Sequence, residues 1–204
     1  MTDADRLRYD ALTRQLERMR AMQYAYNRKF FTLLLVSTAG LLWAFHVPTP
    51  ASLVAVCFGL VTAGVTASFF LHFCDFARVH ARALERRLNR LLGERVLVAS
   101  ELEADYFYPH EARKFSGWVP GRPLTFFSFF TLHFCGVWGL ATAAAGWRLH
   151  QLLAPATFQF LATLYLLWDL ANAAFLGRWF IPATAERRLA RALREAYETA
   201  GDPR

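Results

Sequence analysis

Charged residues are scarce in this chain and are missing from long parts of it. They make up 19% of the 204 residues, below the ~25% that is usual in soluble domains. No Lys, Arg, Asp or Glu occurs in residues 30–74 or 123–147, and only Asp169 occurs in residues 149–177. The hydrophobic fraction of 55% argues against intrinsic disorder, which requires low hydrophobicity. Charge-free runs of this length are typical of membrane spans.

Cysteine and enzyme motifs are also scarce. The three cysteines, Cys57, Cys74 and Cys135, have no CxxC spacing, which argues against a disulfide scaffold and a zinc ribbon. The sequence contains neither GxSxG nor HExxH, so the common hydrolase and metalloprotease sites are absent. We therefore expect no enzyme. One acidic cluster would permit metal binding or acid–base work on a lipid head group, although such clusters more often balance nearby arginines: Glu101, Glu103, Asp105, His110 and Glu111.

Four apolar segments are long enough to cross a bilayer, whose ~30 Å core needs ~20 residues of helix. They are residues 30–47, 51–74, 124–147 and 156–177. The first two are separated only by Pro48, Thr49 and Pro50, which no straight helix crosses. The last two are separated by residues 148–155. The sequence therefore predicts an all-α integral membrane protein with four transmembrane helices arranged as two antiparallel hairpins.

The basic residues predict the orientation of these spans. Residues 1–29, 75–122 and 178–204 hold 22 of the 23 Lys and Arg residues, and Arg148 is the remaining one. Because cytoplasmic flanks are enriched in Lys and Arg, we expect both termini in the cytoplasm of a multi-pass protein of the plasma (inner) membrane. The first 29 residues lack the apolar core of a signal peptide, and the Arg- and Ala-rich composition favours a bacterial origin. Five segments follow: a cytoplasmic amphipathic helix (1–29), hairpin 1 (30–74), a cytoplasmic helix with an interfacial aromatic segment (75–123), hairpin 2 (124–177) and a C-terminal cytoplasmic helix (178–204).

The cytoplasmic segments are expected to be long helical extensions of the spans. Residues 3–29 have helical periodicity and contain no Pro or Gly, so this helix is expected to continue into the first span. An apolar stripe also continues beyond Cys74 until Gly93, a residue typical of helix ends. The net charge of +7 invites a nucleic-acid interpretation, but acidic residues are interleaved throughout, so we expect no nucleic acid. Contact with anionic lipid head groups is a weaker option for the arginines after the second span: Arg78, Arg82, Arg86, Arg87 and Arg90.

Asp169 is the most informative single residue, because it lies near the middle of the fourth span. An Asp at the centre of a transmembrane helix costs ~2.5–3.5 kcal/mol on insertion scales, so such residues face protein or water. Polar residues recur around it at steps of three and four, which places them on one helix face: Gln159, Tyr165, Asp169 and Asn172. This polar stripe is expected to face other helices, another subunit or a water-filled path.

His133 is the expected partner of Asp169. By helix rise it lies roughly 14 Å from the cytoplasmic end of its span, and Asp169 lies roughly 12 Å from the same side. Two interpretations remain open: a proton or ion path, and, more favoured, a buried polar pair that locks the hairpin. His72 and His133 each occur in a Leu-His-Phe-Cys tetrapeptide. They are weak metal candidates, and haem is a minor possibility, because their depths differ by about two turns; otherwise no cofactor is expected.

Small residues recur at four-residue steps in the second span and at a three-residue step in the third, where they let helices approach closely: Ala55, Gly59, Ala63, Ala67, Gly136 and Gly139. Since four spans enclose little space, conduction would need several copies. The sequence thus favours an oligomeric ion channel or pore whose path is lined by the polar stripe and His133. The alternative is a non-conducting structural or regulatory membrane subunit, and a haem-binding protein or lipid-head-group enzyme is less favoured.

Overall fold

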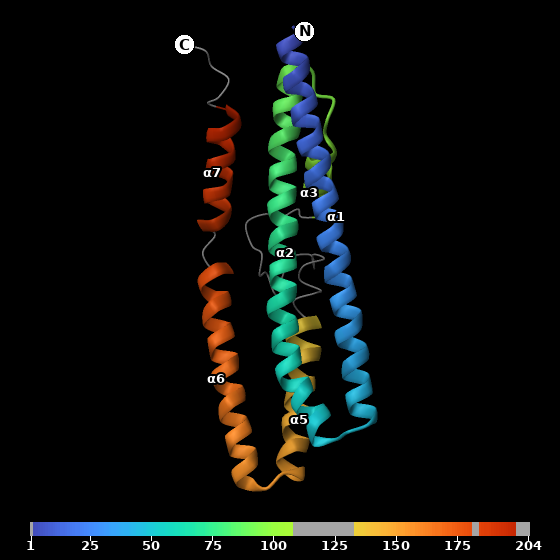
Figure 1. Cartoon of the computed structure of the whole chain (residues 1–204), viewed down its shortest axis with the longest axis vertical. Coiled ribbons are helices and arrows are strands. Elements are labelled where there is room, and N and C mark those ends of the chain that lie inside the picture. Colours follow the sequence, from blue (N-terminus) through green and yellow to red (C-terminus); the bar gives the residue numbers. More distant parts are fainter. Residues whose placement is uncertain (1, 108–132, 181–183, 199–204) are drawn as a thin grey trace, which may run out of the picture. The chain divides into compact units, whose positions relative to one another are not determined.

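A computed structural model describes the backbone of residues 2–107, 133–180 and 184–198, and the side chains of residues 2–103, 136–177, 188–189 and 191–197. Within these ranges the chain is helical and has no strand. The helices are α1 (Asp3–His46), α2 (Pro50–Leu92), α3 (Ala99–Phe107), the π-helical segment η1 (His133–Trp138), α5 (Gly139–Leu152), α6 (Pro155–Phe180) and α7 (Thr184–Glu198) (Figure 1). The all-α prediction is confirmed.

The first two helices each run without a break through a charged segment and an apolar segment. The helix α1 has 44 residues without interruption, because nothing in residues 3–29 favours another conformation. The break falls at residues 47–49, where Pro50 becomes the first residue of α2, the position at which its missing N–H costs nothing. Thr49 caps α2: its Oγ1 accepts a hydrogen bond from the Ser52 N–H at 3.1 Å, and the Ser52 Oγ accepts one from the Thr49 N–H at 2.9 Å.

The far end of α2 falls at Gly93, as the sequence predicts. This residue has a φ of +71°, and it is the only positive φ among the described residues. Its N–H donates to the Arg90 carbonyl at 3.4 Å. The residue just after a helix often has a left-handed conformation. Glycine is usual there, because a Cβ would clash with the backbone.

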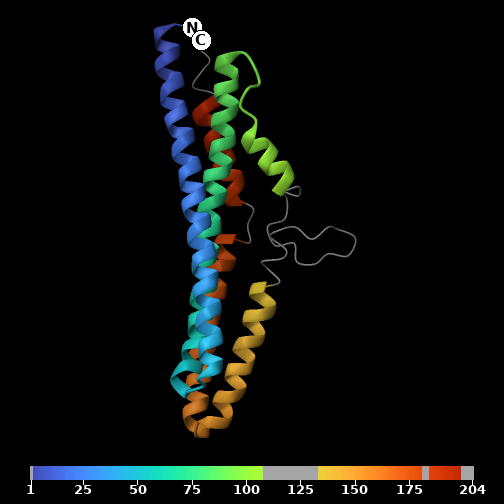
Figure 2. The ribbon, with the colours of Figure 1, turned by 90° about the vertical axis from the view of Figure 1, so that its right-hand side faces the viewer.

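The described chain divides into two compact units, and α1 and α2 contribute to both. Unit 1 contains residues 1–29, 69–109 and 182–204. Its core joins the first part of α1 to the second part of α2 through Leu16, Met19, Ala81, Leu84 and Leu88. Figure 2 shows α3 turning back beside α2 within this unit.

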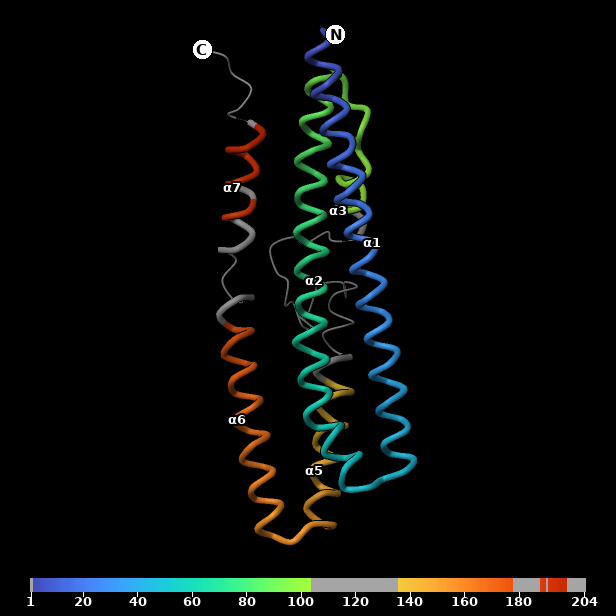
Figure 3. Tube along the Cα trace, viewed as in Figure 1, coloured from blue at the N-terminus to red at the C-terminus, as the bar shows by residue number. Residues whose placement is uncertain are grey.

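Unit 2 contains residues 30–68 and 110–181. Its core brings together the second part of α1, the first part of α2 and the helical stretch formed by η1 and α5. The buried members include Leu41 of α1, Leu53 and Leu60 of α2, and Trp138 and Leu149 of the η1–α5 stretch. Helices α5 and α6 form a hairpin joined at residues 153–154, which Figure 3 shows along the trace.

Three helices in the described part are long and apolar enough to cross a membrane: α1, α2 and residues 155–177 of α6. This finding fits a multi-pass membrane protein. The predicted third span begins at residue 124, and its residues 124–132 are not among those described, so the four-span topology stays a prediction. The interfacial aromatic segment likewise falls largely beyond α3, in the part of the chain that is not described.

Candidate functional site

The polar stripe lies on α6, and its members have different surroundings. The side chains of Gln159 and Asp169 are exposed, whereas those of Tyr165 and Asn172 are half-buried. Asn172 turns back to its own helix, where its Nδ2 donates to the Trp168 carbonyl at 2.7 Å. The stripe is therefore divided between residues that contact the chain itself and residues that face outward.

Tyr165 is the member that packs into unit 2. Its ring meets Phe58 of α2 edge to face, with the centroids 5.6 Å apart and the planes at 88°. Its hydroxyl is hydrogen-bonded to the side chain of Thr142 on α5. The carbonyl of Thr142 also accepts a contact from the Cys57 Sγ at 3.9 Å. Tyr165 thus joins three helices, as buried Tyr side chains with a satisfied hydroxyl commonly do.

Asp169 lies one turn beyond Tyr165 but is exposed. None of the residues in the most apolar window of α6 is buried by the rest of the chain. Large apolar side chains surround the carboxylate on this helix, and Leu166 and Leu170 are each 56% exposed. Asp169 is therefore the single carboxylate of the apolar window of α6, and it lies on a largely exposed part of this helix.

The predicted partner His133 is the first residue of η1, but its side chain lies outside those described, so the His133–Asp169 pair remains untested. A π-helical segment inside a helix is frequent at functional sites. His72 is half-buried, and its ring lies 6.5 Å from that of Phe73. In the described part of the chain, no group of three or more His, Cys, Asp or Glu residues gathers to hold a metal ion.

The small residues of α2 divide in the same way as the polar stripe. Ala63 and Ala67 are buried, whereas Ala55 and Gly59 are exposed. On η1 and α5, Gly136 is half-buried and Gly139 is exposed. A Cβ added to Gly59, Gly136 or Gly139 would meet nothing within 4 Å. These glycines are thus not needed for contacts inside the described chain.

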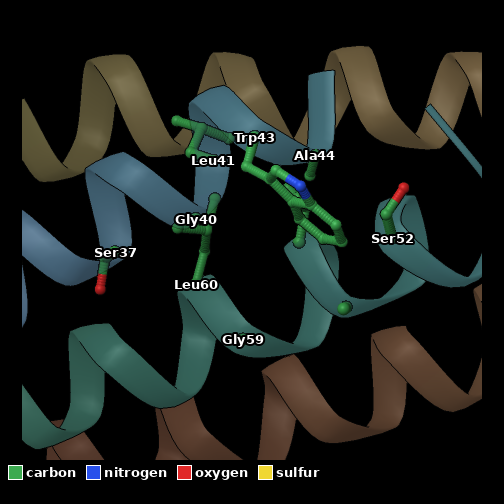
Figure 4. Close-up of a pocket in the computed structure, with 10 residues that line it drawn as sticks. Ser37, Gly40, Leu41, Trp43, Ala44, Ser52, Gly59 and Leu60 are labelled. Carbon is green, nitrogen blue, oxygen red and sulfur yellow. The ribbon is translucent and has the colours of Figure 1, made fainter. Parts of the chain in front are cut away.

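Ala55 and Gly59 line an apolar groove of about 260 Å³ between α1 and α2. Figure 4 shows the Trp43 indole lying along this groove, with Ser37 toward one end and Ser52 toward the other. The Ser52 hydroxyl already donates within its own turn, 3.1 Å from the Val47 carbonyl. The groove therefore offers small apolar surface and little free polarity.

A buried ionic contact in unit 1 was missed by the sequence analysis. Glu85 of α2 is 1% exposed. Its Oε1 accepts a hydrogen bond from Arg20 of α1 at 2.6 Å and another from the Ser100 hydroxyl at 2.9 Å, while its Oε2 accepts from the Ser100 N–H at 3.0 Å. A carboxylate at the N-terminal end of α3 satisfies a free N–H there and matches the helix dipole. Glu85 thereby ties α1, α2 and α3 together.

Asn89, one turn further along α2, binds the backbone of the connecting segment that leads into α3. Its Oδ1 accepts from the N–H groups of Val96 and Leu97 at 3.1 and 2.8 Å, and its Nδ2 donates to the Leu97 carbonyl at 2.7 Å. Glu101 on α3 bonds to Arg95, and this hydrogen bond lowers the pKa of its carboxyl. The connection between α2 and α3 is consequently held by side chains over its length.

The C-terminal helix α7 packs in unit 1 through a second polar contact. The Tyr197 hydroxyl lies 2.7 Å from the His80 Nε2 of α2 and donates to the Gln15 Oε1 of α1 at 3.1 Å. Burial lowers the pKa of His80 and raises that of Tyr197. No signal in the sequence links these residues, because 117 positions separate His80 from Tyr197.

The arginines considered for lipid contact also differ. Arg78 is 8% exposed and lies 3.5 Å from Asp75. The side chain of Arg86 is 55% exposed, and Arg90 is exposed as well. The Arg86 Nε lies 3.7 Å from the Glu101 Oε1. Arg86 and Arg90 are the two exposed members of the group.

No known family model, curated protein or solved structure matches this chain.

Proposed function

We propose that this protein is a homo-oligomeric channel or pore of a bacterial inner membrane, with four spans per chain and both termini in the cytoplasm. The distribution of Lys and Arg supports the orientation. The three apolar helices support a multi-pass arrangement. The η1–α5 stretch supplies the described part of the remaining span. Exposed arginines such as Arg86 and Arg90 meet anionic lipid head groups at the cytoplasmic side.

The exposed carboxylate of Asp169, on a mainly apolar helix whose apolar window has no buried residue, carries this proposal. A carboxylate facing lipid tails costs ~2.5–3.5 kcal/mol at a helix centre, so intramembrane acids mark ion or proton paths more often than lipid contacts. Gln159 is exposed on the same face. A helix with these residues is suited to line a hydrated path, in which rings of acidic side chains select cations.

Several copies are needed to form such a path. The groove between α1 and α2 is apolar, so it does not suit an ion. The proposed path lies on an axis surrounded by the α6 helices of neighbouring copies, where the Asp169 side chains form a ring. The exposed small residues Gly59 and Gly139 permit close contact between copies.

Purified protein reconstituted into liposomes tests the proposal. We expect the wild-type protein to be an oligomer that conducts cations. The Asp169→Asn variant should remain oligomeric. Its cation flux should be at least about tenfold lower than that of the wild type, because one ring of charge is removed. Glu94→Gln is the matched control, since it removes an exposed carboxylate outside the spans and should conduct like the wild type. A monomeric wild-type protein, or one without flux, would overturn the proposal.

A second candidate function, a non-conducting structural or regulatory subunit, is favoured by Tyr165. Half of the polar stripe serves contacts inside the chain, since Tyr165 bonds to Thr142 and packs on Phe58. In this case the wild type gives no flux, while Asp169→Asn lowers the thermal stability of an oligomer or of a complex with a partner protein. The absorption spectrum of the same sample separates a haem carrier, which would show a Soret band.

A further inference from the structure

We propose that the C-terminal helix α7 is a pH-releasable element, which is held against α1 and α2 only while His80 is neutral. The inference depends on the contacts of unit 1 and is independent of the proposed channel. It starts from Leu193 and Tyr197, one turn apart on α7. Leu193 is buried, and Tyr197 packs against the core of unit 1. The hydroxyl of Tyr197 makes polar contacts with both of the other two helices.

The direction of the hydrogen bonds fixes the proton on His80. A tyrosine hydroxyl has one proton, and that of Tyr197 points to the Gln15 Oε1 at 3.1 Å. The Tyr197 oxygen must then accept a hydrogen bond from the His80 Nε2–H, 2.7 Å away. Neutral His80 in this tautomer completes a chain of hydrogen bonds from α2 through α7 to α1.

The other ring nitrogen makes this contact sensitive to protonation. The His80 Nδ1 is buried and has no hydrogen-bond partner among the described residues. In the neutral ring this atom is only an acceptor lone pair, which is tolerated. Protonation turns it into a buried N–H donor without an acceptor among the described residues and places a charge on a half-buried ring. The docked arrangement therefore disfavours the imidazolium form.

None of the described contacts of the ring brings a negative charge to it. From α7 the Tyr197 hydroxyl faces His80, and from α1 the Gln15 amide meets this hydroxyl. From α2 itself the Phe76 ring packs edge-on, with the centroids 5.7 Å apart. Burial is the cause that lowers the pKa of His80.

Charged residues next to these contacts in the sequence are exposed: Arg14 on α1, and Arg194 and Glu195 on α7. Tyr197 is titratable, but burial raises its pKa above the usual 10.0, so it stays neutral at both pH 5.5 and pH 7.5. The side chain of Glu198 is not among those described.

The sign of the pH dependence follows. The pKa of His80 is below 6.5 when α7 is docked and returns toward ~6.5 when the ring is exposed. Docking of α7 is therefore at full strength above pH 6.5. It weakens as the pH falls below 6.5 toward the pKa that His80 has when α7 is docked. Because one proton is linked, docking weakens by no more than about tenfold per pH unit. Release of α7 exposes Leu193 and the Tyr197 ring, which lie on the apolar side of this basic amphipathic helix.

Hydrogen exchange of the full-length protein in lipid nanodiscs tests the inference, with rates corrected for the intrinsic pH dependence of exchange. At pH 7.5 the amides of residues 188–197 should be protected. At pH 5.5 their protection should fall by at least about threefold. Residues 96–103 serve as an internal control, because Glu85 and Asn89 hold them without a histidine, and their protection should stay the same.

Two variants at the contact and one matched control complete the experiment. His80→Gln keeps an N–H donor but does not titrate, so α7 should be equally protected at both pH values. Tyr197→Phe removes the hydroxyl, so α7 should be less protected at pH 7.5 and respond less to acid. His150→Gln, an exposed histidine of α5, should behave as the wild type. The inference fails if wild-type α7 is equally protected at both pH values, or if both contact variants keep the full loss at pH 5.5.

Discussion

Replacing Glu85 by Ala is the most informative perturbation of unit 1, because this one side chain bonds to α1 and α3 while being 1% exposed. Its removal leaves the Ser100 N–H and hydroxyl without their acceptor in a buried place. Arg20 is affected less, since its side chain is 40% exposed and can turn to water, as surface ion partners do.

The magnitude follows from the two bonds to Ser100. A hydrogen bond to a charged group contributes about 1.5–3 kcal/mol, and we take the lower limit for each bond. The loss is then about 3 kcal/mol in the free energy of local opening of α3. Since 1.4 kcal/mol corresponds to a factor of ten, exchange should accelerate by about 150-fold. Ser100→Ala loses only the hydroxyl bond, so about tenfold is expected.

Hydrogen exchange of residues 97–103 measures this opening directly, since local stability differs between segments of one protein. Glu94→Ala is the matched control, because Glu94 is an exposed acid in the same connection, and it should leave the rates unchanged. An acceleration below about threefold in Glu85→Ala would refute the reasoning, as would equal effects of Glu94→Ala.

Three further predictions concern local structure. Gly93→Ala should destabilise the end of α2 by about 1 kcal/mol, because the φ of +71° strains a residue with a Cβ; thermal unfolding measures this. Thr49→Ala should cost about 1 kcal/mol through loss of the Ser52 N–H acceptor, again seen in thermal unfolding. The contact of Glu101 with Arg95 lowers the pKa of this carboxyl, so it should persist at pH 4.5 and be lost at lower pH, and Arg95→Gln should raise that pKa in an NMR titration.

Helix continuity could be predicted from the sequence because it depends on local signals. No Pro or Gly interrupts residues 3–29, and α1 is one helix from Asp3 to His46. Pro50 and Gly93 act through their own backbone, and they mark the beginning and the end of α2. In such cases the residue itself carries the cause, so no knowledge of neighbours is needed.

The burial of Glu85 has a partial signal in the sequence pattern of α2. Ala81, Leu84 and Leu88 form the apolar stripe of α2, and Glu85 lies beside it at the i+4 position from Ala81. That position is buried when the partner helix is close, and here α1 supplies Arg20. The contact of His80 with Tyr197 had no such signal, because it depends on how α7 packs across a long sequence separation.

The division of the polar stripe on α6 sharpens the question of what covers this helix. Tyr165 and Asp169 are one turn apart, so they lie on nearly the same face. The chain covers Tyr165 with Phe58 and leaves Asp169 exposed, so the edge of the intrachain contact runs between them. Under the proposed topology the ~2.5–3.5 kcal/mol cost of this carboxylate is not offset by the described part of the chain. A ring of copies around water offsets it through hydration, whereas a structural subunit offsets it through a hydrogen-bonding partner. Because only the first arrangement lets cations pass, oligomer size and flux measured on the same sample distinguish the two functions.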